Sequence, residues 1–168
     1  MQLLLPLRKK IDKKQGELQL FNEHVDLIPT RKLIQKTIEV CYPGCYDDQV
    51  VEYFKDYNKF DKILLRAKNG FILVYKYNKM IVGTGCLLKS NIEALFVDPL
   101  YQFNGIGRKI VHALIYEASS RNQVRLTVNS TPGALPFFQK LGFSVISEEI
   151  KWVNDYYPIT FYRMRKLF

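Results

Sequence analysis

The feature that most constrains the fold is a strand, a short glycine-containing loop and a helix that follow one another near the middle of the chain. Residues 91–97 form an apolar run, which Asp98 and Pro99 end. From residue 105 to 118, apolar side chains recur every four positions and predict one buried helical face (Ile106, Ile110, Leu114 and Ala118). A buried strand that leads directly into such a helix predicts a sheet with this helix packed on one face.

The loop before this helix has the composition of a phosphate-binding site. Gly105 and Gly107 stand at the helix start, where unpaired N–H groups and the positive end of the helix dipole favour an anion. Gln102 offers a further donor and Arg108 offers charge. The spacing is not the dinucleotide fingerprint, because Ile110 occupies the position of the third glycine, and a P-loop sequence is absent. From the spacing alone, the alternative to a phosphate site is a helix start at which glycine serves only close packing.

The remaining pattern predicts a single α+β (mixed α/β) domain over residues 1–168, of which 1–16 form a basic N-terminal extension. Hairpins combined with strand–helix–strand crossovers predict a central mixed, mostly antiparallel sheet flanked by helices. The expected elements are strand 17–25, helices 26–40 and 47–57, strands 71–77, 80–88 and 91–97, helix 105–118, strand 123–129, helix 134–141, and strands 143–150 and 156–164.

The net charge of +9 suggests an anionic partner, but its distribution argues against a nucleic-acid-binding module. Residues 1–14 hold five basic side chains against one acidic, and three more basic side chains (Arg163, Arg165 and Lys166) lie near the other end. Basic ends more often provide solubility than a shaped nucleic-acid site. The aromatic run 71–77 resembles a single-strand platform, although a buried strand explains it better. No apolar run is long enough to span a membrane, so we expect no membrane partner.

The cysteines favour free thiols in a cytoplasmic protein. Their number is three (Cys41, Cys45 and Cys86), which does not suit a disulfide framework. The first seven residues are apolar before the chain becomes basic, which reverses the order of a secretory signal. Cys41 and Cys45 lack a second Cys or His pair that would complete four ligands, so we expect no metal site.

Two blocks of sequence resemble the GNAT superfamily of acetyl-coenzyme A-dependent N-acetyltransferases. Gln102, Gly105 and Gly107 match its Q/R-x-x-G-x-G/A motif, and the preceding residues 95–99 resemble its coenzyme-binding strand. Residues 137–143, Phe-Phe-Gln-Lys-Leu-Gly-Phe, resemble a second block that ends in Gly-Phe. The matching order of elements covers residues from about 17 to 165.

The resemblance implies roles for individual residues. The strands at 91–97 and 123–129 should splay apart, and the backbone of the first strand (Leu95, Phe96 and Val97) should pair with the pantetheine arm of the coenzyme. The amides of the loop and helix start, together with the Arg108 side chain, should hold the pyrophosphate (Gln102, Phe103, Asn104, Gly105, Ile106 and Gly107). Asn129 should contact the coenzyme arm.

The chain departs from the family pattern at three positions. Phe103 stands where the family has its first glycine, and Asn104 replaces the usual basic residue. Phe138, which we group with the coenzyme-contacting residues, stands where the family often has a tyrosine that protonates the leaving thiolate. Phe138 has no hydroxyl, so the acid must be another group, and Tyr162 and Tyr157 on the last strand are candidates on their chemistry. The alternative is that both tyrosines are core or surface aromatics with no catalytic role.

Glu93 is the candidate general base, because it is the acidic residue within the strand at 91–97. A carboxylate there lies half-buried or faces a cleft, and some relatives use a glutamate on this strand. The alternative is a glutamate paired with a lysine at the strand's exposed end. His112 falls in the middle of a helix, where a packed or solvated histidine is the simpler interpretation.

The resemblance implies acetyl transfer from acetyl-CoA to a primary amine of a small molecule or peptide, by direct attack. The absence of a hydroxyl at Phe138 motivates a second hypothesis, an inactive relative that binds acyl-CoA. A basic nucleic-acid-binding module is the third. The motifs do not constrain the acceptor. Dimers are frequent in the family, so the resemblance also allows a homodimer. Aromatic residues outside the motifs could line an acceptor cleft or fill a core (Tyr42, Tyr46, Tyr53, Phe54, Trp152 and Tyr156).

Overall fold

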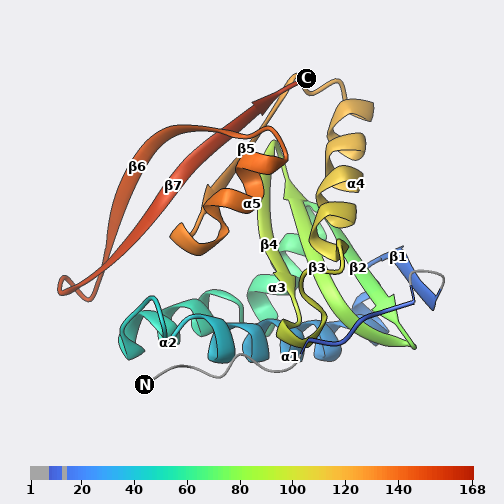
Figure 1. Ribbon diagram of the computed structural model, residues 1–168, viewed down its shortest axis with the longest axis horizontal. Helices are drawn as coiled ribbons and strands as arrows, with labels where there is room; N and C mark the ends of the chain where they lie inside the picture. The colour runs from blue at the N-terminus through green and yellow to red at the C-terminus, as the bar shows by residue number, and fades with distance from the viewer. Residues whose placement is uncertain (1–7, 13–14) are drawn as a thin grey trace.

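The computed structural model describes residues 8–12 and 15–168, and its elements alternate as expected around one sheet (Figure 1). Residues 1–7 and 13–14 of the predicted basic extension lie outside the described residues. The elements are β1 (Gly16–Leu20), α1 (Glu23–Cys41), α2 (Asp48–Tyr57), α3 (Phe60–Asn69), β2 (Phe71–Tyr77), β3 (Met80–Leu88), β4 (Asn91–Val97), the 3₁₀ turn η2 (Pro99–Tyr101), α4 (Ile106–Ser120), β5 (Arg125–Ser130), η3 (Pro132–Ala134), α5 (Leu135–Lys140), β6 (Ser144–Val153) and β7 (Tyr157–Leu167).

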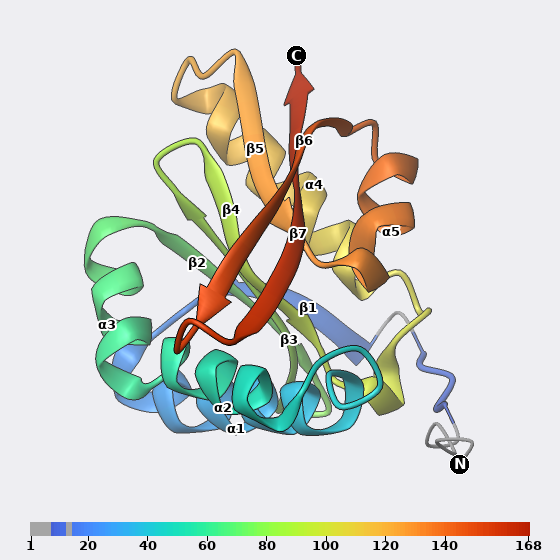
Figure 2. The ribbon, with the colours of Figure 1, turned by 90° about the vertical axis from the view of Figure 1, so that its left-hand side faces the viewer.

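The strands in the described part form one sheet in the order β1-β2-β3-β4-β5-β7-β6. Every neighbouring pair is antiparallel except β4 and β5, which are parallel. Helix α4 covers one face, and α1 with α3 packs on the other (Figure 2). The predicted mixed, mostly antiparallel sheet flanked by helices is therefore confirmed. In the described residues, no helix has the length and apolar character to cross a bilayer.

Two details of the predicted elements were wrong. The strand expected over 17–25 ends at Leu20, because Asn22 caps α1 by accepting a hydrogen bond from the His24 N–H at 3.0 Å. Helix α3 was not predicted at all. Its inward face includes the charged Arg66 beside Ile63, and a buried arginine interrupts the apolar repeat that would reveal a helix.

Two glycines of β3 bring α4 close to the sheet. A Cβ atom at Gly83 would lie 2.8 Å from Ile106 Cγ2, and one at Gly85 would lie 2.6 Å from Ile110 Cγ2. Both contacts are too short for any larger residue without displacing the helix. The Gly-Thr-Gly interruption of this strand therefore sets how closely the helix that follows the glycine loop packs on the sheet.

The predicted splay between β4 and β5 is present. The two strands pair only at their beginning, where Asn91 faces Thr127 and Ile92 faces Val128. From Glu93 onward β4 pairs with β3 alone, whereas β5 pairs with β7 along its whole length. The two strands diverge toward their carboxyl ends (Figure 1), and we call the unpaired interval between them the seam.

The last two strands form a long hairpin that reaches over α2 (Figures 1 and 2). Val153 and Ile159 of the hairpin pack with Val50 of α2 in a small cluster of their own. Both strands run longer than the predicted 143–150 and 156–164. The hairpin and the α1–α2 corner therefore border the open end of the seam.

Candidate active site

The segment that joins β4 to α4, residues 98–105, is a compact loop that we call the glycine loop. Asp98 begins the loop, and its side chain accepts a hydrogen bond from the Leu100 N–H at 2.9 Å. The same carboxylate forms an ion pair with Lys36 at 2.7 Å. Gly105 ends it as the N-cap of α4, with φ of +80°. No side chain caps α4, so its first N–H groups remain available to a ligand. No atom other than those of its chain neighbours lies within 4 Å of the position of a Cβ on Gly105.

Gln102 holds the glycine loop against the end of β4. Its Nε2 donates to the Val97 carbonyl oxygen at 3.1 Å and lies 3.7 Å from the Cys41 sulfur. The side chain predicted as a phosphate donor is therefore engaged in shaping the loop. The next residue, Phe103, has φ of +64° and is 78% exposed. Asn104 closes the loop by donating to the Tyr101 carbonyl oxygen at 3.0 Å.

Strand β4 carries a β-bulge, in its ladder with β3, that the sequence did not reveal. Ala94 has φ of +48°, and neither Ala94 nor Leu95 has a partner in the ladder with β3. A non-glycine residue in the left-handed region is costly and concentrates at functional sites. The bulge directly precedes Phe96 and Val97, which pair again with β3 and which, with Leu95, should accompany the coenzyme arm.

Glu93 lies beside this bulge and is paired with a buried arginine. Its Oε2 is 3.2 Å from Arg66 Nε, and its Oε1 accepts from Asn91 Nδ2 at 3.3 Å. Arg66 also donates to the side chain of Asn58 at 3.1 Å and to the carbonyl oxygen of Tyr57 at 3.3 Å. The carboxylate is therefore held in a fixed position at the closed end of the seam. The partner is an arginine from α3, whereas the structural alternative considered from the sequence was a lysine.

The two aromatic candidates lie on the α4 and α5 side of the sheet. Phe138 is 4% exposed and packs edge-on against Phe137 and Phe143, so its ring belongs to the core. Tyr162 stands opposite Ser130, the last residue of β5, and is half-buried against the same core. The Tyr162 hydroxyl makes no hydrogen bond to any described residue. Tyr157, the other candidate acid, begins β7 and packs on the cluster under the hairpin.

Asn129 lies on the opposite face of β5 from the buried Val128. It is exposed and faces Arg163 of β7 across the ladder. Its neighbour on that face, Thr127, donates to Asn91 Oδ1 at 3.0 Å. A row of polar side chains therefore runs from Glu93 across the seam to β7.

Tyrosines near the α1–α2 corner pack with one another more than they line an open cleft. Tyr42 meets Phe54 edge-on at 4.9 Å between ring centres and lies 5.6 Å from Tyr46. Burial raises the pKa of Tyr42 and raises that of Tyr46 to about 12, so neither phenol ionises readily. The hydroxyl of Tyr46 is buried without a partner in the described residues. Trp152 and Tyr156 at the hairpin tip are exposed.

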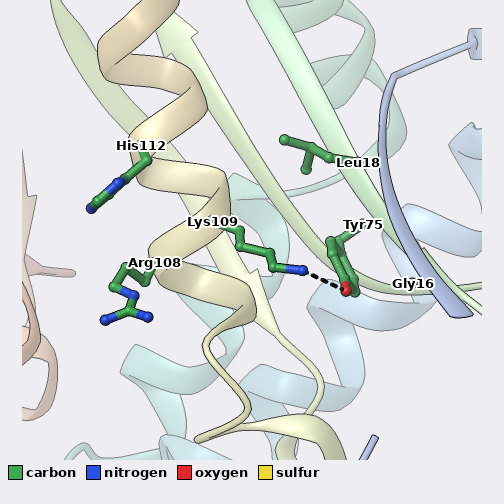
Figure 3. A pocket seen from close by; sticks show the side chains of 6 residues that line it. All are labelled: Gly16, Leu18, Tyr75, Arg108, Lys109 and His112. Atoms are coloured by element: carbon green, nitrogen blue, oxygen red, sulfur yellow. Dashed lines mark hydrogen bonds between the residues drawn. The ribbon is translucent and has the colours of Figure 1, made fainter. Parts of the chain in front are cut away.

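A shallow pocket flanks the first turns of α4 on the side of β1 (Figure 3). Its volume is about 470 Å³, and it is lined by Gly16, Leu18, Tyr75, Arg108, Lys109 and His112. Lys109 Nζ lies 3.4 Å from the Tyr75 hydroxyl, while Arg108 and His112 extend from the same helix. Sequence reasoning missed this pocket because it joins residues nearly 100 positions apart. Arg108 stands in the first turn of α4, and its side chain lines this pocket.

Comparison with known proteins decides the family. Residues 43–168 match the model of the acetyltransferase (GNAT) domain. The chain belongs to the GNAT family. An uncharacterized N-acetyltransferase from Methanocaldococcus jannaschii is 30% identical over 125 residues, covering 58% of this chain and 55% of that protein. The glucosamine 6-phosphate N-acetyltransferase of Trypanosoma brucei is 30% identical over 61 residues, covering 36% of this chain and 42% of that protein. The chain spans about half the length of the curated relatives it matches.

Solved structures with the same fold include coenzyme complexes. A GCN5-related N-acetyltransferase from Rhodopseudomonas palustris has a TM-score of 0.84 at 21% identity, covering 95% of this chain and 100% of that one. PaiA N-acetyltransferase from Thermoplasma acidophilum, in complex with coenzyme A, has a TM-score of 0.74 at 15% identity, covering 91% and 99%. A GNAT acetyltransferase from Elizabethkingia anophelis with acetyl-CoA bound has a TM-score of 0.64 at 17% identity, covering 93% and 100%.

Proposed function

We propose that this GNAT protein transfers the acetyl group of acetyl-CoA to a primary amine. The observation that carries the proposal is the seam between β4 and β5, which has the glycine loop and the uncapped start of α4 beside it. An extended arm fits a strand edge that has lost its partner, and a pyrophosphate fits a helix start with free N–H groups. These two features suit the two halves of coenzyme A.

In this proposal the glycine loop and α4 hold the coenzyme, and the seam holds its reactive end. Free N–H groups at the start of α4 bind the pyrophosphate, with Arg108 adding charge beside them. The β4 backbone from Leu95 to Val97 pairs with the pantetheine arm. Fixing the thioester at the seam makes its reaction with a bound amine effectively intramolecular.

The transfer itself requires an amine that has lost its proton. The amine nitrogen attacks the thioester carbonyl, and the resulting tetrahedral intermediate collapses as the carbon–sulfur bond breaks. Glu93 receives the proton of the attacking amine, directly or through water, because its carboxylate is fixed next to the bulge. A peptide N–H freed by the bulge at Ala94 stabilises the negatively charged oxygen.

The departing thiolate needs a proton, and Tyr162 is the residue we propose to donate it. Its hydroxyl has no partner among the described residues, and it shares a face with α5, where Phe138 has no hydroxyl to offer. The burial of Phe138 in the core also motivates the second candidate function, binding of acyl-CoA without transfer.

The test combines binding with thiol release. Saturating acetyl-CoA should raise the melting temperature, and free coenzyme A should then appear when a suitable amine is added from a panel of amino acids, polyamines, aminoglycosides and peptides. A thermal shift without thiol release on any amine would favour binding alone. No thermal shift would contradict both functions.

A further inference from the structure

Residues 8–12, within the basic N-terminal extension, lie along the glycine loop (Figure 1). We call these five residues the N-terminal segment. The Lys9 N–H donates to the Leu100 carbonyl oxygen at 2.8 Å. Ile11 packs against the hydrophobic core between α4 and the sheet. The segment is therefore fixed beside the loop that we propose to hold the pyrophosphate.

Asn104 makes the attachment specific. Its Nδ2 donates to the Lys9 carbonyl oxygen at 2.8 Å, and its Oδ1 accepts from the Ile11 N–H at 3.3 Å. An asparagine amide offers a donor and an acceptor side by side, so it bonds an extended backbone much as a neighbouring strand does. A basic residue at this position has no acceptor and would leave the Ile11 N–H without its partner.

Phe103 completes the attachment. The Arg8 guanidinium stacks over its ring at 3.6 Å from the centroid. The two positions at which the glycine loop departs from the family motif, Phe103 and Asn104, are thus the two side chains that hold the N-terminal segment.

The segment brings three basic side chains to the surface beside the glycine loop. Arg8, Lys9 and Lys10 are exposed, and none of them forms an ion pair within residues 8–12 and 15–168. The acidic side chain of the glycine loop, Asp98, is already paired with Lys36. Three exposed basic side chains therefore belong to a segment that is hydrogen-bonded to the loop preceding α4.

We propose that the N-terminal segment is part of the coenzyme site and that Arg8, Lys9 and Lys10 bind the phosphate groups at the nucleotide end of coenzyme A. This inference rests on the proposed function. In this proposal the segment supplies the positive charge that the family usually has at position 104. Asn104 positions the segment. Exposed cations contribute modest, salt-screened attraction, and three together should tighten binding about tenfold.

The test compares coenzyme fragments on the full chain. Replacing Arg8, Lys9 and Lys10 with alanine should weaken acetyl-CoA binding about tenfold at low salt. The same variant should leave the affinity for acetyl-pantetheine, which has no nucleotide phosphates, unchanged. Comparison of coenzyme A with 3′-dephospho-coenzyme A tells which phosphate is bound. Asn104→Ala should weaken acetyl-CoA binding in the same salt-dependent way. A matched control replaces three exposed helical lysines elsewhere with alanine (Lys32, Lys62 and Lys68) and should bind normally.

The outcomes separate the two proposals. If the unmodified protein binds acetyl-CoA and the triple variant binds it equally well, the segment has no role in binding and the inference fails alone. Equal weakening toward acetyl-pantetheine would also overturn it, because the effect would not depend on phosphate. If the unmodified protein does not bind acetyl-CoA, the proposed function fails as well.

Discussion

Replacement of Gly105 by alanine tests the glycine loop with little disturbance of the protein. Gly105 has φ of +80°, and a Cβ there would meet no atom within 4 Å. The cost to folding is therefore the cost of an alanine in the left-handed region, roughly 1–2 kcal/mol. For a chain of this size, each kcal/mol lowers the melting temperature by roughly 2–4 °C.

The effect on the coenzyme should exceed this strain. The new methyl group would stand in the open space at the start of α4, where free N–H groups should meet the pyrophosphate. We expect the Kd for acetyl-CoA, measured by titration calorimetry, to rise by about tenfold or more, because a charged hydrogen bond contributes about 1.5–3 kcal/mol.

Gly142 provides the matched control. It has φ of +83°, and a Cβ there would meet only the flexible end of Lys166 at 2.6 Å. Gly142→Ala should therefore lose a similar amount of stability and bind acetyl-CoA normally. If Gly105→Ala binds acetyl-CoA as tightly as Gly142→Ala does, the glycine loop does not contact the coenzyme and our assignment of the pyrophosphate site is wrong.

Three further predictions concern the chemistry and the thiols. Glu93→Gln keeps the shape of the side chain but removes the carboxylate that faces Arg66 and that we propose as the base. The kcat should therefore fall about 100-fold in a thiol-release assay. A normal kcat with a lowered melting temperature would show that the ion pair is only structural. Tyr162→Phe should lower kcat about tenfold without altering the Kd for acetyl-CoA, and unchanged kcat would exclude this hydroxyl as the acid. Iodoacetamide at about pH 8 should label the exposed Cys45 and spare Cys86. Burial raises the pKa of the Cys86 thiol to about 11 and keeps it protonated. Equal labelling of the two cysteines in a peptide mass map would contradict the described packing.

The parts of the site that were predictable are those formed by neighbours in sequence. The strand at 91–97, the glycine loop and the helix after it lie within 30 residues, and their apolar spacing indicated their arrangement. The splay and the coenzyme roles came from the resemblance, and the seam between β4 and β5 confirms the splay.

The parts that escaped prediction depend on contacts between distant segments. Arg66 reaches Glu93 from a helix that its own charge concealed in the sequence pattern. Ala94 adopts a left-handed conformation that only glycine or asparagine would have suggested. Asn104 looked like a loss from the motif, yet its amide binds the backbone of residues more than 90 positions earlier. Local periodicity does not predict such pairings.

Direct observation of the transfer tests the central claim. Acetyl-CoA carrying an isotopic label in its acetyl group would be incubated with the protein and an amine that supports thiol release, and the amine would be analysed by mass spectrometry. We predict that the labelled acetyl group appears on the amine nitrogen in a one-to-one ratio with released coenzyme A, and that the product forms more slowly with Glu93→Gln. Release of coenzyme A without a labelled amine would show hydrolysis in place of transfer and would contradict the proposed function.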